Sequence, residues 1–244
     1  MTKNFCISKS WDNILDKKVL DKTRELVSYI TSQRRNYDEI LPSDNEIFNA
    51  LIQTDFENVR VLIIGQDPYP NKEDAHGLAF SKKTGELPQS LKNIFKEIED
   101  DIGIKNDWGN LSYWSKQGVL LLNRALTIMK DGNKKNENKL LNLNLRLWKE
   151  FINEVLQKLT TRNKPLVIML WGGPANRLFQ IEKDEEYKAK NILILRSSHP
   201  SPLGYTKSND KICAFKGCKH FSKCNEFLKS KGVKEVDWKT YKRN

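Results

Sequence analysis

Residues 61–70, VLIIGQDPYP, decide the fold of this chain. An apolar run ends at Gly65, and an acid, two prolines and a tyrosine follow within five positions. Such a run has the length and composition of a buried strand. The turn after it fixes one carboxylate, Asp67, beside one aromatic ring, Tyr69. The question is which function requires this carboxylate and this ring to be held so rigidly side by side.

The first apolar run extends over residues 59–65. Three more apolar runs of strand length follow it along the chain. They are GVLLLN at 118–123, LVIMLWG at 166–172 and NILIL at 191–195. Amphipathic stretches alternate with them and predict helices at 11–34, from Ser43 with Glu46 as a capping box, and at 90–100, 145–159, 174–183 and 222–231. This alternation predicts an α/β fold of one domain, residues 1–244, whose central four-stranded parallel twisted sheet is flanked by helices on both faces.

The composition is that of an ordinary globular protein, with 38% hydrophobic and 30% charged residues among 244. Asp12 interrupts the N-terminus before a signal peptide can form, and no run approaches the ~20 apolar residues of a membrane span. Four cysteines are few for this length, which favours reduced thiols. We expect a protein of the cytoplasm or nucleus, with the cytoplasm as its location and no membrane contact.

The excess of positive charge lies at one end of the chain. Of the net charge of +11, residues 188–244 hold 14 Lys and Arg against 4 Asp and Glu, so the first 187 residues contribute +1. A localised basic region is typical of proteins that bind a phosphate backbone. A solubilising lysine face explains the charge equally well, so charge alone leaves both interpretations open.

Polar or aromatic residues, or glycines, follow each predicted strand. They are Gln66, Asp67 and Tyr69 after the first, Asn123 after the second, Gly172 and Gly173 after the third, and His199 after the fourth. Ligands of open α/β sheets bind outside the carboxyl ends of the strands, so these loops are expected to line one crevice. The chain has no G-x-S-x-G, G-x-x-x-x-G-K or G-x-G-x-x-G motif. The usual sequence evidence for acyl transfer, nucleoside triphosphate binding or dinucleotide binding is therefore missing.

The chain resembles the family 1 uracil-DNA glycosylases in the order and spacing of its motifs. The matching segments include GQDPYP at 65–70, HGLAFS at 76–81, GVLLLN at 118–123, HPSPL at 199–203 and GCKHFS at 217–222. GQDPY and HPSPL together are highly specific. The resemblance implies a hydrolase that removes uracil from DNA in base excision repair, without a cofactor or a metal.

The resemblance implies a catalytic role for Asp67 and His199. Cleavage of the bond between uracil and deoxyribose places positive charge on the sugar and negative charge on the base, so the site must match both charges. Asp67 would face the sugar cation and orient or deprotonate the attacking water. His199 would donate a hydrogen bond to uracil O2. Without the resemblance, a turn acid and a loop histidine remain the simpler interpretations.

The resemblance also implies a base-binding set of Gln66, Tyr69, Phe80 and Asn123. The amide of Asn123 can pair with uracil N3–H and O4 at once, whereas cytosine presents the opposite pattern. Tyr69 would fill the space that the thymine methyl needs and so reject thymine by a clash. Phe80 would stack on uracil, although an aromatic ring in such a run is more often part of the core.

The remaining implied contacts are to DNA. Leu203, between Pro202 and Gly204, would fill the space left by the flipped base. Hydroxyls and backbone N–H groups would hold phosphates, and their residues are Ser90, Gly172, Gly173, Ser198 and Ser201. Serines at helix starts also act as caps, and both roles can coexist.

Three departures from the family pattern stand out. Pro70 replaces the usual histidine, which puts the hydrogen bonding of the water near Asp67 in doubt. Gly204 replaces the usual serine after HPSPL and predicts a looser loop. Residues 130–141 lack the usual Ser-His, and we assign them no role.

Cys213, Cys218, His220 and Cys224 have the spacing of a metal site. The segment GCKHFSKCN also matches the family's metal-free GC-x-HFS pattern, so we expect no metal there. The prediction as a whole is a monomeric enzyme acting on single- or double-stranded uracil-containing DNA, with a proteinaceous inhibitor as a further partner. The alternatives are a binding module that has lost its chemistry and a glycosylase with another base preference.

Overall fold

A parallel sheet forms the centre of the protein. The computed structural model describes residues 5–37, 39–180, 183–189 and 191–242. The sheet has the order β3-β2-β5-β6, with β2 at Val61–Gly65, β3 at Val119–Asn123, β5 at Leu166–Trp171 and β6 at Ile192–Ser197. All its pairs are parallel. The predicted α/β class and four-stranded parallel sheet are confirmed, with each strand within three residues of its predicted bounds.

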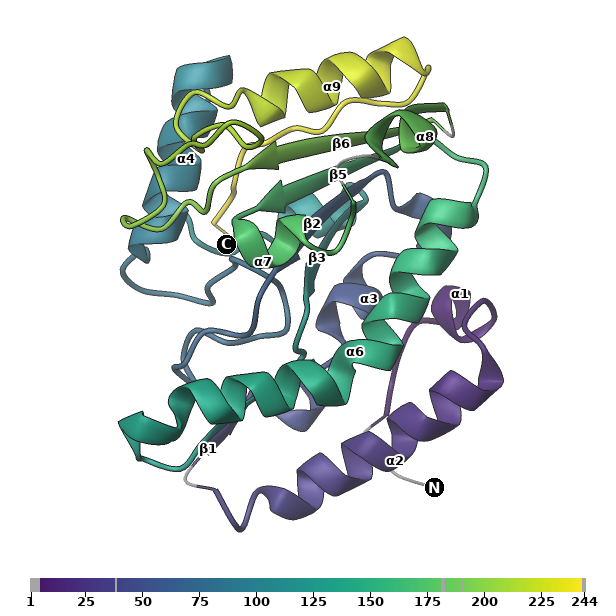
Figure 1. The fold of residues 1–244 in the computed structure, drawn as a ribbon, viewed down its shortest axis with the longest axis vertical. Helices are drawn as coiled ribbons and strands as arrows, with labels where there is room; N and C mark the ends of the chain where they lie inside the picture. Colours follow the sequence, from purple (N-terminus) through teal and green to yellow (C-terminus); the bar gives the residue numbers. More distant parts are fainter. Residues whose placement is uncertain (1–4, 38, 181–182, 190, 243–244) are drawn as a thin grey trace.

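The inner strands read as continuous apolar runs because both faces of the sheet are covered. Every residue of β2, β3 and β5 is buried. In Figure 1, α4 (Gln89–Ile102) and α9 (His220–Ser230) lie on one side of the sheet, and α6 (Glu137–Thr161) and α2 (Lys17–Gln33) lie on the other. The register pairs Gly65 with Asn123, so β2 and β3 end side by side.

Several helices differ from their predicted bounds. The predicted helix 11–34 is two helices, α1 (Lys9–Asp12) and α2, because the side chain of Asp16 accepts hydrogen bonds from the N–H groups of Lys18 and Val19 and starts α2. The helix predicted at 145–159 is α6, which begins eight residues earlier. The helix predicted at 174–183 is the short α7 (Gly173–Asn176), followed by an unpredicted α8 (Asp184–Ala189), while residues 181–182 lie outside the described residues.

The capping box predicted at Ser43 is wrong. The hydroxyl of Ser43 bonds to the carboxylate of Glu46, and not to a backbone N–H. A 3-10 helix, η1 (Asp44–Glu46), follows, and the next α-helix, α3, spans only Asn49–Gln53. The local pattern correctly marked Ser43 as the residue before a helical turn, but the turn is a 3-10 helix and not the start of an α-helix.

Smaller elements escape a periodicity analysis because they are too short. They are α5 (Ser112–Lys116), the 3-10 helices η2 (Phe56–Asn58) and η3 (Lys134–Asn136), and an antiparallel pair of β1 (Glu39–Leu41) with β4 (Ile128–Lys130). β4 brings Ile128 beside the carboxyl end of the main sheet. Among the helices of the described residues, none has the length and apolarity needed to cross a membrane.

Candidate active site

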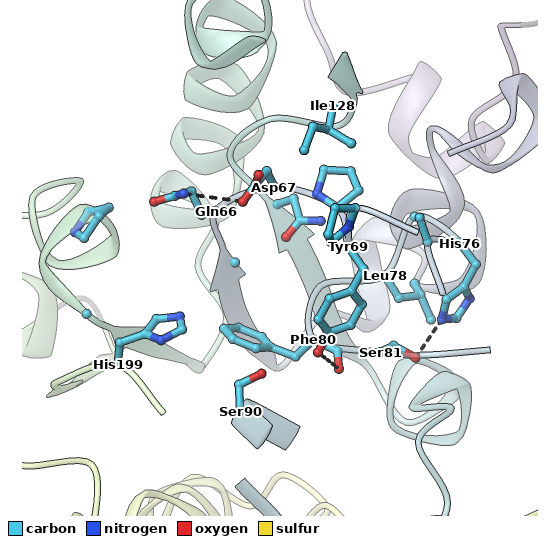
Figure 2. Close-up of a pocket in the computed structure, with 18 of the residues that line it drawn as sticks. Gln66, Asp67, Tyr69, His76, Leu78, Phe80, Ser81, Ser90, Ile128 and His199 are labelled. Carbon is cyan, nitrogen blue, oxygen red and sulfur yellow. Dashed lines mark hydrogen bonds between the residues drawn. The ribbon is translucent and has the colours of Figure 1, made fainter. Parts of the chain in front are cut away.

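A pocket of about 450 Å³ lies at the carboxyl ends of the strands. We call it the active pocket. It brings together nine of the twelve predicted site residues, which are Gln66, Asp67, Tyr69, Phe80, Ser90, Asn123, Gly172, Gly173 and His199. Figure 2 shows Asp67, Tyr69, Phe80 and His199 around the same hollow, although they come from two loops, one after β2 and one after β6. Parallel strands end at one edge of the sheet, which is why residues up to 133 positions apart meet here.

Asp67 stands at the end of β2 in a largely dehydrated position. Burial raises the pKa of its carboxyl to about 6, and a hydrogen bond from Gln66 opposes the rise. That bond is weak, because Gln66 Nε2 lies 3.4 Å from Asp67 Oδ1. An aspartate with a pKa near 6 is still ionised at neutral pH and is a better base than an exposed one.

Asn123 offers an unused acceptor to the pocket. Its Oδ1 is buried and has no hydrogen-bond partner within the part of the chain that the structure describes. A buried carbonyl oxygen without a partner costs about 1–3 kcal/mol, so a ligand donor at this point would recover that energy. The absence of a side chain at Gly65 makes room for it, since a Cβ there would lie 2.2 Å from Asn123 Oδ1.

The loop around His199 fixes which ring nitrogen faces a ligand. Nδ1 of His199 accepts a hydrogen bond from the N–H of Ser201 at 3.0 Å. Burial lowers the pKa of His199, so the ring is neutral at pH 7 and its proton resides on Nε2. The ring is therefore a neutral hydrogen-bond donor that lines the active pocket.

Two glycines allow this placement of His199. A Cβ at Gly172 would lie 3.0 Å from His199 Cβ, and a Cβ at Gly204 would lie 2.5 Å from the carbonyl oxygen of His199. Gly172 also has a φ of +91°, which favours glycine. Gly204 thus allows a close approach of the loop, where the sequence predicted a looser one.

Tyr69 and Phe80 form one side of the pocket and hold each other in place. The hydroxyl of Tyr69 donates a hydrogen bond to the carbonyl oxygen of Phe80 at 3.1 Å. Burial raises the pKa of Tyr69 to about 12, so its hydroxyl keeps its proton. Phe80 has a φ of +61°, a strained value for a non-glycine residue, and its ring lies 5.2 Å from that of Trp171.

Two pocket residues near Phe80 in the sequence, His76 and Ser81, had no role assigned from the sequence. The buried His76 and Ser81 are joined by a hydrogen bond of 2.7 Å between Nε2 and Oγ, and Ser81 Oγ also accepts from the N–H of Leu111. Burial lowers the pKa of His76 to about 4, so it is neutral. Both residues line the active pocket. The HGLAFS motif contains them, but only its phenylalanine was assigned a role.

The phosphate contacts predicted for Ser198 and Gly172 do not fit this geometry. The hydroxyl of Ser198 donates to the carbonyl of Gly204, and its N–H donates to the carbonyl of Cys213. The N–H of Gly172 donates to the carbonyl of Ser197. These donors hold the loop together and are not free for DNA.

The other predicted DNA contacts lie around the mouth of the pocket or on the same loop as His199. Ser90 is the second residue of α4 and lines the active pocket, as does Gly173. Leu203 is 81% exposed, an unusual position for a leucine. Ser201 is part of the His199 loop through its backbone N–H. The roles of these residues stay predictions.

A second cavity lies beside Pro70. The carbonyl of Pro70 accepts a hydrogen bond from Lys130 Nζ, which also pairs with Glu39. A cavity of about 430 Å³ lies between this proline and residues 128–141, and Asp67 lines it as well as the active pocket. The carboxylate is thus approached from two sides.

The Cys-His segment is part of the packing of α9. Carboxylates of α4 bind its backbone, Glu97 through the N–H groups of Gly217 and Lys219, and Asp101 through those of Phe221 and Ser222. His220 Nδ1 accepts from Trp171 Nε1 at 3.0 Å. Within the described residues, no group of three or more His, Cys, Asp or Glu side chains is placed to hold a metal ion.

Comparison with known proteins gives one consistent family. The sequence model described as the uracil DNA glycosylase superfamily matches residues 52–229. Curated relatives named uracil-DNA glycosylase include one from Campylobacter hominis, 40% identical over 97% of this chain and 94% of its own length. Another, from Dictyostelium discoideum, is 42% identical over 97% of this chain, which spans 65% of that longer protein.

Solved structures agree with the sequence matches. A mimivirus UNG variant in complex with UGI matches with a TM-score of 0.79 and 26% identity, covering 96% of this chain and 89% of its own. The mimivirus uracil-DNA glycosylase itself matches with a TM-score of 0.74 at 24% identity, covering 98% of this chain and 97% of its own, which supports the fold. From the sequence matches and the fold together, this chain belongs to the uracil DNA glycosylase superfamily.

Proposed function

We propose that this protein is a uracil-DNA glycosylase, which hydrolyses the bond between uracil N1 and deoxyribose C1′ in DNA and so starts base excision repair. One observation carries the proposal. The unpartnered Oδ1 of Asn123, the dehydrated carboxylate of Asp67 and the neutral ring of His199 meet in one pocket. A flipped pyrimidine needs such a set, and family membership supports it.

The bond cleaves with both electrons leaving on the base. Negative charge then grows on uracil N1 and O2, and positive charge grows on C1′ and the ring oxygen of the sugar. Nε2–H of His199 donates to O2 and binds more strongly as that oxygen becomes anionic. The carboxylate of Asp67 stabilises the sugar cation and directs a water to C1′, taking its proton when the C–O bond forms.

Selection of uracil follows from the other walls of the pocket. Oδ1 of Asn123 accepts from uracil N3–H, and its amide donates to O4, a pattern that cytosine does not match. Tyr69 is held by its bond to Phe80 and blocks the C5 methyl of thymine by a clash, because attraction alone discriminates one methyl by only ~1–3 kcal/mol. Phe80 stacks on the base, and Gln66 borders it from the strand end.

The DNA is bent open by the exposed Leu203, which takes the place of the extruded base. Extrusion costs a few kcal/mol, and this wedge slows the return of the base. We further propose that residues 1–244 form one domain, built on one connected hydrophobic core, and that the protein acts as a monomer in the cytoplasm. A proteinaceous inhibitor is a further proposed partner, because a structural neighbour is recorded in complex with UGI.

A single gel tests the proposal. The protein is incubated with labelled oligonucleotides that carry one uracil, thymine or cytosine, and the products are heated in alkali to cleave abasic sites. We expect strand breaks from the uracil oligonucleotide alone. No break from uracil, together with retained DNA binding, would point instead to the binding module that has lost its chemistry.

A further inference from the structure

A second groove of about 770 Å³ lies beside α6 and has no role in the chemistry above. We call it the α6 groove. Its charged lining residues are all basic, and two amides accompany them. These six polar residues are Arg124, Lys139, Asn142, Arg146, Lys149 and Asn153. The groove is larger than the active pocket, and none of the acidic residues that the structure describes lines it.

Five of the six polar residues form one stripe along α6. Positions 139, 142, 146, 149 and 153 are three or four residues apart, so they share one face of the helix, and all five are exposed. From residue 139 to residue 153 the helix rises by 14 residue steps, so the stripe is about 21 Å long. That length corresponds to about six phosphate steps along one duplex strand at ~3.4 Å each. The stripe is therefore too elongated for a single small anion.

Three acids belong to α6, Glu137, Glu150 and Glu154; among the described residues none of them lines the groove, and the last two are paired. Glu150 pairs with Lys22 of α2 at 2.6 Å, and Glu154 pairs with Lys158 at 3.3 Å. Among residues 5–37, 39–180, 183–189 and 191–242, no ion pair is found for Arg124, Lys139, Arg146 or Lys149. The cations of the groove thus form no ion pair in the described protein, although the charge of Lys139 reaches the carboxylate of Asp131.

Arg124 connects the groove to the active pocket. It follows Asn123 directly, its N–H donates to the carbonyl of Gly65, and it lines a small cavity shared with Gln66 and His199. Burial lowers the pKa of Arg124, and the neighbouring charge of Arg177 lowers it further. Two cations held close together without an acid attract an anion strongly.

The uncharged part of the groove suits a nucleic acid strand as well. Leu145, Ile152 and Leu178 give it an apolar lining between the polar side chains. Phosphates pair with Lys and Arg, amides donate to phosphate and sugar oxygens, and apolar side chains contact sugars and bases. A strand that leaves the active pocket past Arg124 meets all three kinds of contact in order along α6.

We propose that the α6 groove binds the phosphate backbone of the DNA strand flanking the nucleotide in the active pocket, an inference that rests on the proposed function. The occupant is a strand because the cations follow each other over the length of several nucleotides. The affinity it supplies is independent of sequence and sensitive to salt.

The test compares two double variants that remove the same charge. Arg146→Gln with Lys149→Gln alters the α6 groove. Lys17→Gln with Lys18→Gln alters two exposed lysines at the start of α2 and serves as the control. Fluorescence anisotropy measures the binding of uracil-free oligonucleotides of 20 and 5 nucleotides over a series of salt concentrations. Circular dichroism confirms that both variants are folded.

For the groove variant we expect roughly tenfold weaker binding of the 20-mer at low salt, and a salt slope reduced by about 1.4 to 1.8 for two lost phosphate contacts. The 5-mer and the control variant are expected to change less than twofold. Equal losses in both variants, or no loss in either, would overturn the proposal. So would normal DNA binding combined with lost binding of polyglutamate, because an acidic protein would then be the occupant.

Uracil release from a 5-nucleotide substrate separates this proposal from the proposed function. We expect the groove variant to release uracil from it at the same rate as the unaltered protein, because the substrate is too short to follow α6. If the unaltered protein releases no uracil, the proposed function fails, while the anisotropy comparison still decides whether the groove binds DNA.

Discussion

The active pocket and the α6 groove are built on different physical principles. The pocket uses few residues, most of which are buried or half-buried, and hydrogen bonds fix the side chains of Tyr69 and His199. The groove uses several cations, three of which are exposed and repeat along one helix. Placement of dipoles in a dehydrated site gives large effects for each residue, whereas exposed charges in water give small effects that add. This difference sets the expected size of every mutation.

The largest effect is expected from Asp67→Asn. The variant keeps the shape of the site but loses the charge that faces the sugar cation and the base that accepts the proton, so kcat for uracil release should fall about 10³-fold or more. Asp107→Asn, at an exposed acid, is the control and should change kcat less than twofold. A kcat of Asp67→Asn within tenfold of the unaltered protein would remove Asp67 from this role.

The same variant should be more stable at neutral pH. The pKa of Asp67 is raised from 3.8 to about 6 in the folded protein, so ionisation costs stability that is lost as pH rises between these values. Asn removes that cost, which we put at about 1–2 kcal/mol after allowing for partial exposure. Thermal unfolding should show the gain at pH 7.5 and none at pH 3.5.

Next in size is the pair Asn123→Ala and Asn142→Ala, one amide from each region. Loss of the buried amide of Asn123 should lower kcat/KM for uracil release by about 10²-fold, because in the proposed function it pairs with the base in a dehydrated site. Loss of the exposed amide of Asn142 should lower it less than threefold. Similar losses in both variants, measured on the same 20-mer, would contradict the division between the regions.

Tyr69→Ala tests selectivity in the pocket. Removal of the ring opens the space for a C5 methyl, so thymine release should rise by about tenfold or more over the unaltered protein, as expected for removal of a steric block. Tyr241→Ala, at an exposed tyrosine, is the control. If Tyr69→Ala leaves thymine intact, another wall of the pocket carries the selectivity.

The pH profile distinguishes the pocket from the groove. Since the pKa of Asp67 is about 6, kcat/KM should fall about tenfold for each pH unit below that value and stay level above pH 7, where the carboxylate is ionised. His199 has a lowered pKa and is neutral over that level range. Binding of uracil-free DNA should lack the Asp67 step, and a DNA-binding curve that follows the same step would tie the two regions together.

The smallest effect is expected from one cation of the groove. Lys139→Gln should reduce the slope of log affinity against log salt by about 0.7 to 0.9, one phosphate contact. Anisotropy with the 20-mer measures it, and Lys18→Gln is the control. An unchanged slope for Lys139→Gln would mean that the DNA strand does not reach Lys139.

The pocket was largely predictable from the sequence, and the groove was not. Residues at strand ends must gather at one edge of a parallel sheet, so Asp67, Asn123 and His199 could be placed together from strand pattern and motif resemblance. The charge count, in contrast, pointed to residues 188–244. The lysines and arginine of α6 could not be singled out because Glu137, Glu150 and Glu154 nearly cancel their charge in the sequence, whereas in the structure Glu150 pairs with Lys22 and Glu154 with Lys158.

The sequence by itself determined that the protein has a parallel sheet and which side chains follow each of its strands. The reason is that a strand covered on both faces is a continuous apolar run, which can be recognised locally in the sequence. Only the tertiary structure decided which donors are free. It showed that the donors of Ser198 and Gly172 are used within the loop and that Gly204 lies against His199. It also showed that three cations of α6, Lys139, Arg146 and Lys149, share one face. Contacts between segments far apart in the chain decide which donors already have partners and which helix face carries the unpaired charges. A local sequence pattern contains no information about such contacts.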